Sequence, residues 1–329
     1  MRSRSRVLSD FINNIYLSRS DAVSQLLLPR HILRKNASYV SAGYLDQGIP
    51  PKSVSQSFEI PVYEHGHPLI QGIIDGLRPL SGDLHAAIVH GSYGYGDPVG
   101  YSDFDGLLIV KDETMRDPER LAGLAAGLRG LRKEIFKIDP LQHHGWFVLA
   151  EQDLDHYPGN FLPPETLMYA RSLTGKAQTL NITMEEPPDY REHLNKAAAN
   201  MLRSLRNKPE DMNLYRLKGV FSLFMLMPAL YVQARDGKGI FKKFSFDEAR
   251  RDFTAEEFGI MDEISSIRHD WKVRLTSFQR FALSGNGIIT SRFRKVMHLP
   301  PPPGLRPKLN TGLFSRMEHF TKLCVLKSQ

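Results

Sequence analysis

The chain has 329 residues, of which 41% are hydrophobic and 24% charged, with a formal net charge of +7. This composition is ordinary for a folded globular protein, excludes pervasive disorder, and contains no uninterrupted apolar run as long as a membrane span. The length favours two domains, and the single cysteine, Cys324, excludes a disulfide scaffold or a thiolate zinc site and suits the cytoplasm.

The N-terminal half is predicted to hold a helical segment and then an α/β core. Residues 1–55 form the segment, with expected helices at 7–17 and 21–28 and a closing loop at 48–51. Residues 56–184 form the core, in which apolar periodicity predicts the elements. These are a helix at 69–77, a strand at 86–89, a strand ending at 110, a helix at 114–133, a strand within 138–149 and a helix at 164–175.

The segment between the first two core strands carries the clearest chemical pattern. An apolar strand leads into Gly91-Ser92, and the pair Asp103 and Asp105 follows with Phe104 between them. Alternate residues of a strand share a face, so the two carboxylates are expected to point together. Two carboxylates held together repel each other unless a cation is present, and Mg²⁺ prefers such oxygen ligands. Glycine-rich turns let backbone N–H groups approach phosphate.

The C-terminal half is predicted to be helical. A linker at 185–189 opens a domain spanning residues 185–299, with helices at 190–206, at 214–235 with a bend at Pro228, and from 246 onward. Thr254 and Glu257 have the spacing of a capping box at the start of another helix. Residues 300–329 form a basic extension with an expected helix at 313–326.

The pattern from Gly91 to Asp105 resembles that of nucleotidyltransferases of the DNA polymerase β superfamily. The resemblance implies an α/β (α+β) nucleotidyltransferase core with a mixed sheet, followed by an all-helical domain. It also implies that Asp103 and Asp105 bind Mg²⁺ and that Gly91 and Ser92 hold the triphosphate of an NTP. Two positions depart from the pattern, because His90 and Gly106 stand where apolar residues are more usual.

A third acid, usual in active members of the superfamily, has no obvious equivalent here. The expected position falls near His143 and His144, and Asp139 is the nearest carboxylate. A histidine there could act as a general base or bind a metal. Adjacent strand residues point to opposite faces, so at most one of the two histidines can serve. His143, His144 and Asp139 therefore all stay candidates.

The helical domain of such transferases supplies cations to the triphosphate, and the candidates here are Lys218, Lys242 and Lys243. We expect a Mg²⁺-dependent nucleotidyltransferase that moves a nucleoside monophosphate from an NTP to the hydroxyl of an unidentified small molecule, protein or RNA. The missing acid leaves a catalytically degenerate nucleotide-binding or regulatory protein as an alternative.

The charge distribution leaves a further alternative. Residues 1–40 and 290–329 carry net charges of +5 and +7, whereas residues 41–289 carry −5. Basic ends can neutralise nucleic-acid phosphates, so an RNA-binding module also stays open, although a solvated basic surface is the simpler interpretation. No membrane partner is expected.

Overall fold

The structure is a computed structural model that describes residues 4–13, 37–38, 40–41, 53–159, 161–184, 188–206, 212–273, 275–279, 299, 301 and 305–329. The chain divides into two compact units, each described by itself below. Unit 1 comprises residues 1–98, 102–187 and 277–291, and unit 2 comprises residues 99–101, 188–276 and 292–329. The finer division into four segments stays a prediction, and the expected helix at 21–28 and loop at 48–51 lie outside the described residues.

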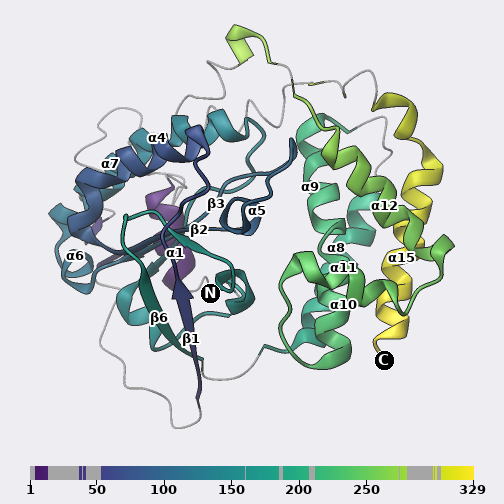
Figure 1. Ribbon diagram of the computed structural model, residues 1–329, viewed down its shortest axis with the longest axis horizontal. Coiled ribbons are helices and arrows are strands. Elements are labelled where there is room, and N and C mark those ends of the chain that lie inside the picture. The colour runs from purple at the N-terminus through teal and green to yellow at the C-terminus, as the bar shows by residue number, and fades with distance from the viewer. Residues whose placement is uncertain are drawn as a thin grey trace. The chain divides into compact units, whose positions relative to one another are not determined.

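Unit 1 is built on a mixed four-stranded sheet with the strand order β4-β3-β2-β5. Its central strands β2 and β3 are labelled in Figure 1. The central strands β2 and β3 are antiparallel, β5 is antiparallel to β2, and β4 is parallel to β3. These strands are β2 (Leu84–His90), β3 (Asp105–Val110), β4 (Phe147–Ala150) and β5 (Arg171–Ser172). A separate antiparallel pair consists of β1 (Val54–Ile60) and β6 (Gln178–Met184). The predicted mixed sheet is confirmed.

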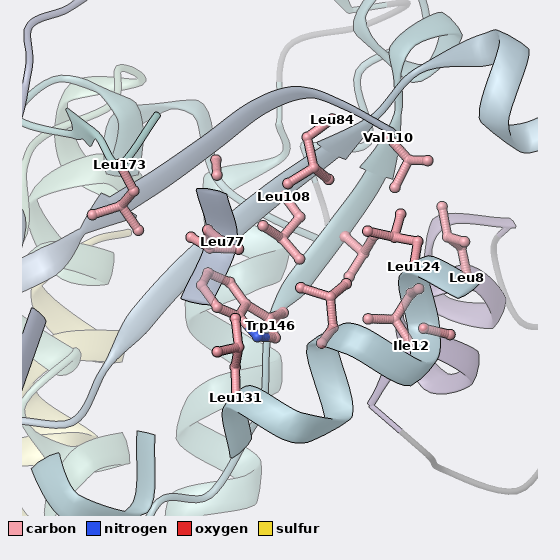
Figure 2. Close-up of a cluster of buried hydrophobic side chains, with 14 of the residues drawn as sticks. Leu8, Ile12, Leu77, Leu84, Leu108, Val110, Leu124, Leu131, Trp146 and Leu173 are labelled. Atoms are coloured by element: carbon pink, nitrogen blue, oxygen red, sulfur yellow. The ribbon is translucent and has the colours of Figure 1, made fainter. Parts of the chain in front are cut away.

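Helices cover one face of the four-stranded sheet. They are α1 (Arg4–Ile12), α4 (Pro68–Leu77) and α7 (Pro118–Ile138). Their apolar residues, among them Leu8, Leu77 and Leu124, pack with Leu108 and Val110 of β3 in one buried cluster (Figure 2). The opposite face of the same strands packs on Leu180 and Ile182 of β6, in a second cluster. Because both faces are covered, β2 and β3 are apolar along most of their length.

Short helices complete unit 1. They are η1 (Arg78–Asp83), α5 (Gly91–Tyr95), α6 (Asp112–Arg116), η2 (Glu151–Leu154) and η3 (Pro164–Leu167). The predicted helix at 114–133 is in fact divided between α6 and α7, because Asp117 leaves helical geometry and its side chain accepts hydrogen bonds from the N–H groups of Glu119 and Arg120. This is an ordinary N-cap with Pro118 at the first helical position.

The predicted helix at 164–175 is wrong. Only the single 3₁₀ turn η3 forms, and the chain then extends into β5. The N–H of Leu173 donates to the carbonyl of Ala87 at 2.8 Å, and the N–H of Ser172 donates to the carbonyl of Pro61 at 2.8 Å. Pairing with residues distant in the sequence therefore outweighs the local pattern in this segment.

Unit 2 is helical, as predicted. Its helices are α8 (Tyr190–Leu205), α9 (Leu214–Phe224), α10 (Met227–Asp236), α11 (Lys242–Arg250), α12 (Ala255–His269), η5 (Arg306–Lys308) and α15 (Thr311–Lys327). The capping box is confirmed: Thr254 Oγ1 accepts from the N–H of Glu257, and the Glu257 carboxylate accepts from the N–H of Thr254. The short segment 99–101 also belongs to this unit, although it lies between two stretches of unit 1 in the sequence.

Within the described part of the chain, residues 214–236 are long and apolar enough to cross a membrane by length and composition. In the structure this stretch is divided into α9 and α10, and 72% of its most apolar window is buried inside the protein. A core helix passes the same test, so the stretch is only weak support for a membrane span.

Candidate active site

The Gly91-Ser92 turn lies directly against the second carboxylate of the predicted pair. Gly91 ends the extended backbone of β2 with a φ of +63°, which side-chain-bearing residues rarely adopt. A Cβ atom at this position would lie 2.3 Å from Oδ2 of Asp105. Glycine is therefore required twice, once by the backbone conformation and once by the close approach of Asp105.

The two aspartates lie at the start of β3. Asp105 is the first residue of the strand and pairs with His90 of β2, whereas Asp103 lies two residues before the strand. Phe104 between them is fully buried in the core that the helices cover. The carboxylates keep about a quarter of their side-chain surface exposed, at 26% for Asp103 and 25% for Asp105. The predicted alternation is thus observed.

His144 completes the group. Its Nε2 atom lies 3.1 Å from Oδ1 of Asp105 and 3.4 Å from Oδ2 of Asp103. Among the described residues, these three side chains form a group whose potential ligand atoms lie within 4.8 Å of one another. The side chain that reaches the two carboxylates is therefore a histidine, close to the sequence position where the third acid was expected.

The ionisation of His144 is coupled to the two aspartates. Burial alone would lower the pKa of His144, but its hydrogen bonds to Asp103 and Asp105 outweigh this cost and hold the pKa well above its usual value. Nδ1 of the same ring lies 3.0 Å from the carbonyl oxygen of Gly145, which favours a proton on Nδ1. Nε2 is then the ring atom available to a cation or to a second proton.

The other two candidates for the third position lie outside this group. His143 is half-buried and does not join the cluster. Both histidines lie before β4 (Phe147–Ala150) and not within a strand, so the strand argument used for them does not apply. Asp139 is buried at the end of α7, where its Oδ1 atom accepts a hydrogen bond of 3.0 Å from the N–H of Leu141. This geometry favours His144 over both alternatives.

The two departures from the family pattern have structural explanations. A Cβ atom on Gly106 would lie 2.5 Å from the rings of both Phe104 and Trp146, so the indole ring fills the space of the missing side chain. Trp146 itself is buried in the core near Leu131 (Figure 2).

His90 is the second departure, and no role was assigned to it from the sequence. It pairs with Asp105 across the two central strands, so their side chains share one face. The ring is buried, and its Nε2 atom has no hydrogen-bond partner within the described residues. Burial lowers the pKa of His90 despite the nearby Asp105, which keeps the ring neutral. The sequence offered one signal for His90, which is a polar side chain at the end of an otherwise apolar strand.

The candidate cations all lie in unit 2. Lys218 is fully buried, and its Nζ atom donates to the carbonyl oxygen of Tyr101 at 2.8 Å, while the Tyr101 hydroxyl donates to the carbonyl oxygen of Lys218. This reciprocal pair favours a structural role for Lys218. Lys242 and Lys243 are the first residues of α11, where Lys243 is exposed. Nucleotide binding by these lysines stays a prediction.

Comparisons with known proteins identify no family for this chain. No family model and no curated protein matches the chain. Among solved structures, the chain is similar to spectinomycin adenyltransferase AAD(9) from Enterococcus faecialis, crystallised with ATP and spectinomycin. The match has 11% sequence identity and a TM-score of 0.35, and it covers 66% of this chain and 96% of that one. A similarity of this size says nothing about substrate, so the functional argument depends on the site itself.

Proposed function

We propose that the chain is a divalent-metal-dependent nucleotidyltransferase that moves a nucleoside monophosphate from an NTP to an acceptor hydroxyl. The observation that carries this proposal is the convergence of Asp103, Asp105 and His144 beside the Gly91 turn. Two partly exposed carboxylates that meet at a glycine-rich bend can serve a cation and a phosphate chain together.

The donor set fits a divalent cation. Two carboxylate oxygens suit Mg²⁺, and an imidazole nitrogen also suits softer ions such as Mn²⁺. Asp103 and Asp105 would hold the cation with His144 as the third ligand. A bound divalent cation neutralises triphosphate charge and lowers the pKa of a coordinated hydroxyl. The buried His90 pairs with Asp105 across β2 and β3, so its ring lies on the same face of the sheet.

The roles of the remaining residues follow from their positions. The backbone N–H groups of Gly91 and Ser92 and the Ser92 hydroxyl are the donors proposed for the triphosphate oxygens. Since these groups are fixed before the substrate arrives, they contribute by orienting the NTP and by stabilising charge rather than by covalent chemistry.

The test is pyrophosphate release with Mg²⁺ or Mn²⁺ and each NTP, measured over small-molecule, protein and RNA acceptors. Replacing both carboxylates (Asp103→Asn with Asp105→Asn) keeps their shape and removes their charge, so turnover is expected to fall by roughly 1,000-fold. The exposed Asp155 of unit 1 provides the control variant Asp155→Asn, which should leave turnover unchanged. Turnover that survives the double substitution would reject the proposal.

The same measurements distinguish the proposed enzyme from the alternative of a degenerate nucleotide-binding protein. That alternative is favoured by the presence of His144 in place of an acid, and it predicts NTP binding in a calorimeter without pyrophosphate release under any acceptor condition. Substitution of His144 by glutamate restores a carboxylate at the third position. A gain of turnover in His144→Glu from an inactive wild type would favour the degenerate alternative.

A further inference from the structure

A buried glutamine holds the residue between the two aspartates. Gln142 is only 1% exposed and lies in the segment between α7 and β4. Its Oε1 atom accepts a hydrogen bond of 2.9 Å from the N–H of Phe104, and its Nε2 atom donates one of 2.7 Å to the carbonyl oxygen of Phe104. Both lengths are those of good hydrogen bonds, and one side-chain amide therefore satisfies both backbone groups of Phe104.

This contact lies just before the residues that pair with the neighbouring strands of the sheet. The parallel pairing of β3 with β4 begins at Leu107 and Phe147, and the antiparallel pairing of β3 with β2 begins at Asp105. Phe104 lies before both of these ladders. The side-chain amide of Gln142 therefore replaces the hydrogen bonds that a neighbouring strand would make with the N–H and the carbonyl of Phe104.

The two hydrogen bonds restrain the backbone that carries both carboxylates. The N–H of Phe104 belongs to the peptide plane that joins it to Asp103, and its carbonyl belongs to the plane that joins it to Asp105. Holding both planes restricts the backbone rotation on each side of Phe104. The same Nε2 atom is 3.5 Å from Nδ1 of His144, so Gln142 also borders the third member of the group.

We propose that Gln142 is a positioning residue that sets the geometry of the Asp103–Asp105–His144 group for a divalent cation. This inference depends on the proposed function, because it names the residue that aligns the ligands of that site. Residues that orient metal ligands without touching the metal typically change its affinity or the activity by 10- to 100-fold when replaced.

The experiment measures Mn²⁺ binding to the full-length chain by calorimetry and by electron paramagnetic resonance, without NTP. Gln142→Met keeps the length of the side chain and removes both hydrogen bonds, and its Mn²⁺ affinity is expected to fall by roughly 10- to 100-fold. The control is Gln233→Met, which removes a buried glutamine amide from unit 2 and should change the affinity by less than about twofold.

Two further measurements distinguish a positioning role of Gln142 from a purely structural one. Circular dichroism must show a folded variant, and turnover of Gln142→Met should recover at high Mn²⁺ concentration, which a general loss of folded protein would not do. If Gln142→Met does not fold, Gln142→Asn keeps an uncharged amide but withdraws it from Phe104, and the same loss of affinity is expected.

The outcomes distinguish the two proposals. A wild-type chain that binds no Mn²⁺ would overturn the metal site and the positioning role together. A wild-type chain that binds Mn²⁺ with the same affinity as a folded Gln142 variant would overturn the positioning role alone and leave the proposed function intact.

Discussion

Both units contain ordinary ion pairs, such as Arg120 with Asp83 in unit 1, but one group of charged side chains in unit 1 differs from those in unit 2. In unit 1, two carboxylates and a histidine converge on one point, each with between 25% and 31% of its side chain exposed. In unit 2, carboxylates are paired with strongly basic side chains: Arg235 pairs with Asp236 and Asp252, and Lys327 pairs with Glu257. The only fully buried cation described there, Lys218, donates to a backbone carbonyl.

This contrast indicates where function and stability are located. Gathering like charges costs folding free energy, because each carboxylate raises the energy of its neighbour's charged form. A protein retains such a group where a ligand offsets the repulsion, and perturbed groups of this kind concentrate at functional sites. Dispersed and neutralised charges carry no such cost and mainly define how helices pack. The following substitutions test this difference, beginning with the largest expected effect.

Gly91→Ala should damage unit 1 most. The new methyl group would meet Asp105 Oδ2 at 2.3 Å, and displacing that carboxylate is expected to lower turnover by about 100-fold. The matched control is Gly175→Ala, where φ is +76° and no atom lies within 4 Å of the added Cβ. Both variants incur the left-handed backbone cost of about 1–2 kcal/mol, so only the carboxylate displacement differs. Equal turnover in the two variants would contradict the close approach of Asp105.

Lys218→Met should weaken unit 2 without a specific effect on nucleotide binding. Its loss leaves the buried carbonyl of Tyr101 without this donor, and the free energy of unfolding is expected to fall by about 1–3 kcal/mol. Lys196→Met removes an exposed lysine on α8 and should cost less than about 0.5 kcal/mol. Urea denaturation measures both values. A raised KM for the NTP with unchanged stability would instead favour the nucleotide-binding role predicted from the sequence.

Acidification should lower the free energy of unfolding of unit 2 through protonation of Glu257, and this is the smallest of the expected effects. Hydrogen bonds from the Thr254 N–H and then from Lys327 lower the pKa of Glu257. A lowered pKa in the folded state contributes stability above the ordinary glutamate pKa of about 4.3, and this contribution is lost as the pH falls through the folded value. Denaturation between pH 7 and pH 3 should therefore show a shallower loss in Glu257→Gln, which keeps an acceptor for Thr254. Identical pH profiles would exclude this contribution.

Much of the fold and of the candidate site could be predicted where the informative residues are close in sequence. The glycine turn and the Asp103–Asp105 pair span fifteen residues, and strand alternation alone predicted that the two carboxylates point in the same direction. Apolar periodicity likewise located α4, α8 and most of unit 2. The helix predicted at 164–175 failed because β5 forms through backbone pairing with β2, which no local pattern reveals.

The parts of the site that could not be predicted depend on contacts across the sequence. The choice between His143 and His144 required knowing which ring faces the carboxylates. Gln142 carries no motif, and its role becomes visible only when its amide lies against Phe104, 38 residues earlier. Lys218 was a candidate cation for the triphosphate, and its burial against the carbonyl of Tyr101 could not be seen from the sequence.

The placement of residues 99–101 in the helical unit has a practical consequence for dissecting this protein. The chain leaves the sheet unit after the glycine turn, contributes Tyr101 to the helical unit, and returns at Ser102, one residue before the first carboxylate. A fragment that ends at the linker would keep Tyr101 but lose Lys218 and Trp271, its packing partners. Truncation at residue 187 would therefore disturb the unit that it is meant to isolate, and coexpressing both halves is the better way to study the candidate active site.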